Sequence, residues 1–122
     1  MRHSALRRYF RHGMLPQLMV FEAVARLGSF TQAGEELCLA QPTVSVQVRK
    51  LSDSLGLPLL KISGRKVVLT EAGKQVYETV QVLFRFFIAA DDRLEELRKL
   101  RGVPARRVEP ANANLVGVTG AG

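Results

Sequence analysis

The sequence predicts a mainly α-helical fold in which three short helices and a two-stranded hairpin precede one long helix. Three observations support this prediction. Apolar residues recur at helical spacing in three stretches between residues 14 and 55, and each stretch ends beside a glycine or a tight turn. Two short apolar runs then flank a Ser-Gly-Arg sequence at 63–65, as in a hairpin. Finally, apolar residues at alternating steps of four and three run from 76 to 97.

Positive charge is concentrated at the start of this 122-residue chain, whose length suits one domain with tails. The net charge of +7 divides into +4 over residues 1–13, +2 over 14–70, −1 over 71–100 and +2 over 101–122. A basic segment beside a near-neutral one favours a polyanionic partner on one side of the molecule. The alternative, a soluble basic domain without such a partner, stays open on charge alone.

Local signals predict where the three short helices begin and end. Gly28 ends the first helix, and Ser29 begins the second with the S-x-x-Q pattern of a capping box. A turn at 38–40 separates the second helix from the third, which carries Pro42 in its first turn and ends at Gly56. The residues of the third helix that recur on one side, and that we expect to be buried, are Val44, Val48, Leu51 and Leu55.

Two helices joined by a turn of about three residues have the layout of a helix-turn-helix, whose second helix enters the major groove of DNA. With the hairpin that follows, residues 14–70 are predicted to form a three-helix winged helix-turn-helix with a two-stranded wing. The basic residues 1–13 are then an N-terminal extension, and residues 71–100 are a separate long helix.

The outward side of the third helix carries residue types that suit DNA. Gln41 can form two hydrogen bonds with adenine, and Arg49 can reach guanine or phosphate. Pro42 and Val46 offer apolar surface to a thymine methyl group, although an exposed valine is also common on surfaces without function. The side chains expected to contact phosphates are Thr43, Ser45 and Lys50 on this helix and Arg65 and Lys66 at the hairpin tip, where charges can also serve only to keep a turn solvated.

The long helix at 71–100 is about 45 Å long at a rise of about 1.5 Å per residue, and Thr70 can cap its start. Its apolar repeat covers three heptads, which is typical of a coiled-coil seam, and we expect the seam to form a homodimer. The alternative is packing on the helix's own domain, which we assign to Tyr77, Phe84 and Ile88. The predicted dimer seam consists of Val76, Val80, Leu83, Phe87, Ala90, Leu94 and Leu97.

Other function classes find no support in the residue inventory. Cys38 is the only cysteine, which excludes an intrachain disulfide, favours a reducing cytoplasmic location and suggests a small buried thiol in its turn. No apolar run reaches the roughly 18–20 residues of a membrane span, and the basic start lacks the apolar core of a secretory signal. His3 and His12 belong to no cluster with metal-ligand spacing. The sequence therefore predicts no enzyme, no metal and no cofactor.

The run from Leu18 to about Leu100 resembles the N-terminal DNA-binding domain and linker helix of LysR-type transcriptional regulators. Within that family, residues 41–60 and 64–73 look closest to the branch that controls carbon-fixation (RuBisCO) operons. The residues that carry the resemblance are Phe21, Val24-Ala25-Arg26, Gly28-Ser29-Phe30-Thr31, Ala33, Leu37, Gln41-Pro42-Thr43-Val44-Ser45, Leu55-Gly56, Leu59, Arg65, Leu69-Thr70 and Ala72-Gly73.

The resemblance implies a winged-helix fold, a linker helix that forms the dimer, and double-stranded DNA with an interrupted inverted repeat as the partner. It implies DNA contacts by the residues at Gln41, Pro42, Thr43 and Ser45. Ser29 and Thr31, in the matching stretch at the start of the second helix, complete the expected DNA-binding set.

The chain departs from the family pattern at Ala40, at Ser52, where glutamate is common, at Ile62, where arginine is common, and in its C-terminal part. Ala40 stands where serine is usual, which removes a helix cap that typically contributes about 1 kcal/mol. Family members also carry a C-terminal effector-binding domain. Here residues 101–122 look like a disordered tail that stops at what resembles the first strand of that domain, at 115–119. We therefore expect no small-molecule effector site in this chain.

The leading expectation is a homodimeric, sequence-specific DNA-binding protein that regulates bacterial transcription, with RNA polymerase as a further partner. The alternative is a truncated interaction partner that dimerises with full-length regulators and interferes with them. The two differ in whether the homodimer alone binds a specific DNA site.

Overall fold

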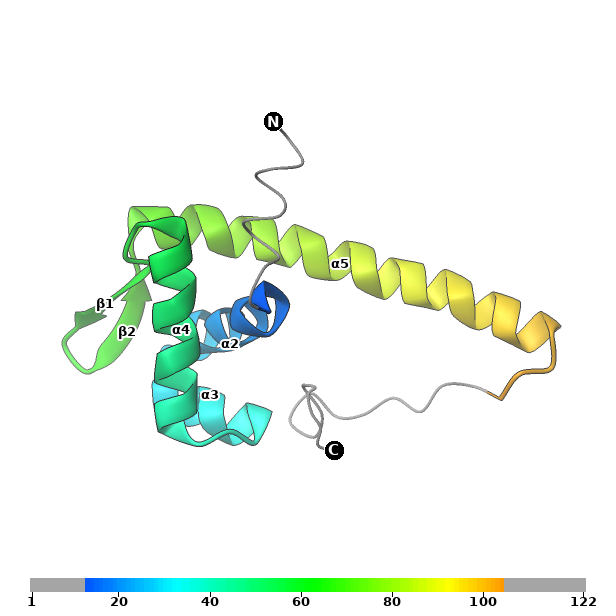
Figure 1. Ribbon diagram of the computed structural model, residues 1–122, viewed down its shortest axis with the longest axis horizontal. Coiled ribbons are helices and arrows are strands. Elements are labelled where there is room, and N and C mark those ends of the chain that lie inside the picture. The colour runs from blue at the N-terminus through cyan, green and yellow to red at the C-terminus, as the bar shows by residue number, and fades with distance from the viewer. Residues whose placement is uncertain (1–12, 105–122) are drawn as a thin grey trace.

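The computed structural model describes residues 13–104, so the basic start of the chain and the strand expected at 115–119 lie outside the described residues. The described part is mainly helical with one two-stranded antiparallel sheet, which confirms the predicted fold class (Figure 1). The elements run in the order α2 (Met14–Leu27), α3 (Phe30–Leu37), α4 (Gln41–Leu55), β1 (Leu60–Ser63), β2 (Lys66–Leu69) and α5 (Glu71–Leu100).

Local capping defines the ends of the short helices. Gly28 follows α2 with a φ of 69°, and its N–H donates to the carbonyl of Val24 at 2.8 Å. The Ser29 hydroxyl accepts a hydrogen bond from the N–H of Gln32 at 3.0 Å, so Ser29 caps α3 as predicted. Gly56 ends α4 with a φ of 78°, a left-handed conformation that glycine adopts without steric cost.

Helix α2 lies at the centre of the domain and has apolar residues on two sides. One side, with Val20 and Val24, packs into a cluster with residues of α3, α4 and β2. The other side, with Leu18 and Phe21, packs into a second cluster with Leu59 and residues of α4 and α5. Phe21 is fully buried there, and burial of such a side chain contributes about 1.5–3 kcal/mol. Helix α2 therefore joins the helix-turn-helix to α5 through apolar packing.

The hairpin is attached to the domain by a backbone hydrogen bond from its second strand. Strands β1 and β2 pair antiparallel, from Leu60 opposite Leu69 to Ser63 opposite Lys66. The N–H of Val67 donates to the carbonyl of Gly28 at 3.1 Å, which holds the second strand against the α2–α3 turn. The wing is therefore fixed in position relative to the start of α3.

Helix α5 packs on the domain with its first half and extends past it with its second half (Figure 1). The Thr70 hydroxyl accepts a hydrogen bond from the N–H of Gly73 at 2.9 Å and donates one to the carbonyl of Pro58 at 2.7 Å. Thr70 thus caps the helix as predicted and also ties it to the loop before β1. No helix within residues 13–104 has the length and apolarity needed to cross a membrane.

The predicted seam of α5 divides between these two halves. Val80 is only 1% exposed, and Val76 and Leu83 pack partly buried against the same cluster. Val80 is therefore a core residue of its own domain, which corrects its assignment to the dimer seam. The periodicity of a helix locates an apolar stripe, but it does not distinguish a stripe covered by the helix's own domain from one covered by a partner.

The expected packing of α5 on its own domain is right for two of three residues. Tyr77 and Phe84 pack against the cluster around Phe21, as predicted. Ile88 is 62% exposed, so the prediction for this residue was wrong. It lies beyond Phe84, the last residue of α5 that packs against this cluster.

Arg26, in the last turn of α2, links acidic residues on two helices. Its Nε donates to Oε2 of Glu22 on α2 at 2.8 Å, and its Nη1 donates to Oε1 of Glu36 on α3 at 3.2 Å. Glu22 also accepts a hydrogen bond from the side-chain amide of Gln81 on α5 at 3.3 Å. We call these four residues the Arg26 bridge. Hydrogen bonding to Arg26 lowers the pKa of Glu36, and hydrogen bonding to Glu36 and Glu22 raises the pKa of Arg26.

Glu36→Gln should remove a stabilisation that depends on pH. Because the pKa of Glu36 is lower in the folded chain, its contribution is fully present above the unfolded pKa of about 4.3 and is lost as the pH falls through the folded value. A partly exposed ion pair contributes up to about 1 kcal/mol. Urea unfolding should show the wild-type chain more stable than the variant at about pH 7, and this difference in stability should shrink as the pH is lowered to about 2.5. An equal difference at both pH values would contradict the assignment.

Candidate DNA-binding surface

The turn between α3 and α4 depends on a close approach of backbone to backbone. The N–H of Leu39 donates to the carbonyl of Gly34 at 2.9 Å, and a Cβ at Gly34 would lie only 2.7 Å from the Leu39 carbonyl oxygen. Cys38 adopts a left-handed conformation with a φ of 57°. The chain therefore reverses within three residues, which is the spacing of a helix-turn-helix.

Cys38 is exposed, which corrects the expectation of a buried thiol. Its backbone ends α3 in the left-handed region, whereas Leu39 next to it is half-buried and packs against the core cluster. In a turn this tight, successive side chains point in different directions. Here the leucine fills the apolar position and the cysteine faces solvent.

Burial of one side of α4 determines which side faces outward. Val44 and Leu51 are fully buried and Val48 is 6% exposed, so the inward stripe is the predicted one apart from Leu55, which is half-buried. Val46 is 39% exposed on the opposite side. The predicted DNA-binding residues of α4 that are exposed are Gln41, Pro42, Thr43, Val46, Arg49 and Lys50, while Ser45 is half-buried.

The start of α4 has no side-chain cap. Ala40 is extended, and its carbonyl accepts hydrogen bonds from the N–H groups of Thr43 at 2.9 Å and Val44 at 3.2 Å. Pro42 lies in the first turn, where its missing N–H leaves no donor unsatisfied. An uncapped helix start carries a partial positive charge, which favours an approaching phosphate.

The start of α3 lies next to the wing, because Gly28 binds Val67 of β2. Ser29 is half-buried and acts as a helix cap, because its hydroxyl oxygen accepts the N–H of Gln32, while its hydroxyl hydrogen can still donate to an acceptor such as a phosphate oxygen. Thr31 is exposed in the first turn of α3. Of these two predicted DNA-binding residues, Thr31 is the more accessible.

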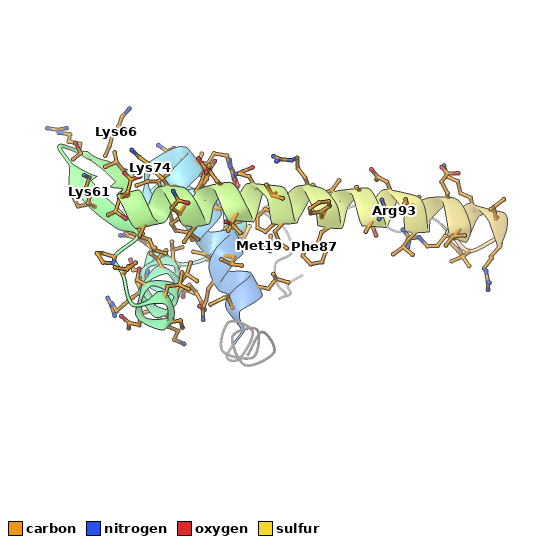
Figure 2. All side chains as sticks on the ribbon, turned by 90° about the horizontal axis from the view of Figure 1, so that it is seen from above. Met19, Lys61, Lys66, Lys74, Phe87 and Arg93 are labelled. Carbon is orange, nitrogen blue, oxygen red and sulfur yellow. The ribbon has the colours of Figure 1, made fainter. Side chains whose placement is uncertain are left out.

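The wing carries more basic residues than the sequence prediction named. Arg65 lies in the turn and Lys66 begins β2, and both are exposed, as is Lys61 in β1. Figure 2 shows Lys61, Lys66 and Lys74 at the wing end of α5, far from Phe87 and Arg93. Sequence reasoning missed Lys61 and Lys74, because it considered only the hairpin tip. For Lys61 the available signal was the short length of the hairpin, since no residue of the hairpin lies far from its tip.

The basic side chains of α4 and the wing are not neutralised by acidic partners. No ion pair within residues 13–104 involves Arg49, Lys50 or Arg65, whereas Arg98 on α5 pairs with Glu95 at 2.6 Å. Unpaired basic side chains can bind phosphate oxygens and release the counterions of DNA. Among the described residues, no three or more His, Cys, Asp or Glu side chains form a group that could hold a metal ion.

A short α3, an outward-facing α4 and a basic hairpin attached beside them define a winged helix-turn-helix DNA-binding domain. Residues 15–74 match the family model described as a bacterial regulatory helix-turn-helix protein of the lysR family. The fold also matches the crystal structure of the BenM_DBD/catB site 1 DNA complex, with a TM-score of 0.59, 31% identity, and coverage of 71% of this chain and 94% of that chain. The chain belongs to the LysR family.

Two curated relatives identify the branch of the family to which the chain is similar. The RuBisCO operon transcriptional regulator of Allochromatium vinosum is 48% identical over 87 residues, 71% of this chain and 29% of the relative. The HTH-type transcriptional activator CmpR of Synechocystis sp. is 52% identical over 68 residues, 56% of this chain and 22% of the relative. The expected likeness to RuBisCO-operon regulators is confirmed. The chain spans less than a third of the length of these relatives.

Proposed function

We propose that this chain binds double-stranded DNA sequence-specifically as a homodimer, on an interrupted inverted repeat, and thereby regulates transcription, with RNA polymerase as a further partner. The observation that carries the proposal is the rotation of α4. Buried Val44 and Leu51 hold one side of α4 in the core, so that Gln41, Val46 and Arg49 are exposed together on the other side. DNA complexes of structures similar to this chain support double-stranded DNA as the partner.

The exposed residues of α4 and the wing would contact different parts of the DNA, according to their chemistry. Gln41 and Arg49 can form paired hydrogen bonds with base edges, each contributing about 1–3 kcal/mol of discrimination against the wrong base. Val46 supplies an apolar contact for a thymine methyl group. Arg65 and Lys66 on the wing would bind phosphates, which adds affinity without adding sequence preference.

The second half of α5 supplies the proposed dimer surface. Phe87 is 54% exposed, Leu94 49% and Leu97 54%, while Ala90 between them is half-buried. Because Val76, Val80 and Leu83 pack on their own domain, the surface open to a partner is shorter than the predicted seam. We define the dimer surface as Phe87, Ala90, Leu94 and Leu97. These residues keep the steps of three and four that allow two helices to interdigitate.

Selection of binding sites from randomised duplex DNA, at two salt concentrations, tests this function. We expect enrichment of an inverted repeat whose half-sites lie one or more helical turns apart, because a symmetric dimer presents two copies of α4. Recovery of unselected DNA with a steep salt dependence would mean that only phosphate contacts form. That result would favour the alternative, an interaction partner of longer relatives, which a heterodimerisation assay would then test.

Replacing Gln41 and Arg49 by alanine should abolish the preference for the selected site while leaving the fold intact. Both side chains are exposed, so their loss creates no cavity. Loss of one base-reading pair costs about 1–3 kcal/mol of discrimination. The matched control is the double variant Gln75→Ala and Arg85→Ala, which removes the same side-chain types from exposed positions of α5. The preference of each double variant for the selected site is measured by competition with unrelated DNA. The same preference in both double variants would show that these residues of α4 do not read the DNA sequence.

A further inference from the structure

The Arg26 bridge joins three helices that have different roles in the proposed function. Glu36 belongs to α3 of the helix-turn-helix, Arg26 and Glu22 belong to the central α2, and Gln81 belongs to α5. Hydrogen bonds connect these side chains in sequence, at 3.2 Å from Arg26 to Glu36, 2.8 Å from Arg26 to Glu22 and 3.3 Å from Gln81 to Glu22. A polar connection therefore runs from the helix-turn-helix to the helix that carries the dimer surface.

Arg26 is the central residue of this connection. Its guanidinium donates two hydrogen bonds to each of two carboxylates, and the side chains are 40% exposed for Arg26, 14% for Glu22 and 28% for Glu36. Without the guanidinium, the carboxylates of Glu22 and Glu36 would face each other without a counter-charge. Like charges repel, and the repulsion between these two carboxylates would move α3 away from α2.

The apolar clusters hold the same helices together but constrain their relative rotation less. Apolar burial is non-directional and depends on area, so it opposes the separation of two helices more strongly than a small change in the angle between them. Hydrogen bonds weaken steeply when the donor angle falls below about 120°. A guanidinium bound to two carboxylates on different helices therefore resists the small rotations that apolar packing permits.

We propose that Arg26 is a positioning residue: together with Glu22, Glu36 and Gln81 it holds the reading unit, α3 and α4, at a set angle to α5, and so determines which separation of half-sites a dimer accepts. The consequence for half-site separation rests on the proposed dimeric DNA binding, whereas the angle within one chain does not. A rigid angle between the reading unit and α5 lowers the affinity of the dimer for an operator whose half-sites are too close or too far apart. A looser angle lets the dimer adapt to such an operator.

The geometry of the single chain can be measured without DNA. One spin label is attached to Cys38, which is exposed at the end of α3, and a second to Asp92→Cys, an exposed position on α5. Labelled chains are diluted into an excess of unlabelled Cys38→Ser chains, so that only distances within one chain are recorded. We expect a narrow distance distribution for the chain with an intact bridge and a broader or shifted one for Arg26→Gln. An unchanged distribution would overturn the proposal.

Further variants separate the two arms of the bridge. Glu36→Gln weakens the arm to α3 by removing its negative charge, and Gln81→Ala removes the arm to α5; each should broaden the distribution less than Arg26→Gln does. The matched control is Glu95→Gln, which removes a 2.6 Å pair with Arg98 that lies within α5 and joins no two helices. The control should leave the distribution unchanged. Broadening by Glu95→Gln as strong as that by Arg26→Gln would also overturn the proposal, since any ion pair would then have the same effect.

The consequence for DNA is tested with inverted repeats whose half-sites are moved apart one base pair at a time. An exposed ion pair changes an equilibrium by at most about fivefold, so Arg26→Gln should reduce the preference for the best separation over its neighbours about three- to fivefold. An unchanged preference would overturn the role in operator choice. If the wild-type chain selects no inverted repeat, the proposed function fails, and the distance measurement still decides whether Arg26 holds the angle.

Discussion

Leu94→Asp should convert the proposed dimer into a monomer and lower its affinity for an inverted repeat by about 10²- to 10⁴-fold. Leu94 is 49% exposed on the extended half of α5, so the monomer tolerates a charge there. In a dimer the same position would be buried opposite an apolar side chain, and an unpaired carboxylate there is strongly unfavourable. Two linked half-site contacts exceed a single one by about 10²- to 10⁴-fold in affinity, and this advantage disappears with the dimer.

The control for this experiment lies on the same helix. Ile88 is 62% exposed and apolar, but it lies outside the dimer surface of Phe87, Ala90, Leu94 and Leu97. Ile88→Asp should therefore preserve both the dimer and the affinity. Sedimentation equilibrium measures the association of each variant, and titration with labelled duplex measures its affinity. A dimer that survives Leu94→Asp but not Ile88→Asp would place the contact on the other side of α5.

Gly73→Ala should destabilise the fold by about 3 kcal/mol or more, at the upper end of what overpacking costs. A Cβ at Gly73 would lie 2.0 Å from the carbonyl oxygen of Leu59, which is backbone and cannot rotate away. The first turn of α5 would have to move off the loop before β1. This movement would strain the Thr70 hydrogen bonds to Gly73 and Pro58.

Gly56→Ala provides the comparison, because it separates steric overlap from backbone strain. Gly56 has a φ of +78°, yet a Cβ there meets no atom within 4 Å. The expected cost is therefore only the left-handed conformation, about 1–2 kcal/mol. Urea unfolding of both variants measures the difference. A smaller loss of stability for Gly73→Ala than for Gly56→Ala would show that the loop before β1 moves more easily than the close contact implies.

The ends of the helices followed from the sequence because their causes are local. Ser29 caps α3 and Gly56 ends α4 through groups that lie within a few residues of each other. The inward stripe of α4 also followed, since Val44, Val48 and Leu51 recur at the helical period and one side of such a helix must be buried. The outward position of Gln41, Val46 and Arg49 is the geometric consequence of that stripe.

Other features of the candidate site depend on contacts between distant parts of the chain. The first turn of α5, which carries Lys74, packs closely on the loop before β1 because Gly73 has no side chain to meet the carbonyl oxygen of Leu59 (Figure 2). The Arg26 bridge brings Glu36 and Gln81 to one central helix, although nothing in their sequence spacing of more than forty residues relates them. Such contacts arise from the packing angle of helices, which periodicity alone does not encode.

The sequence by itself determined that this protein has a helix-turn-helix with a basic wing and a long apolar-striped helix, because capping, turns and periodicity act over short distances. Only the tertiary structure decided how the stripe of α5 is used. The domain covers Val80 and leaves Leu94 exposed, although both residues have the same period and similar chemistry. The physical reason is that burial depends on where the rest of the chain lies, and the domain is shorter than the helix it packs against (Figure 1).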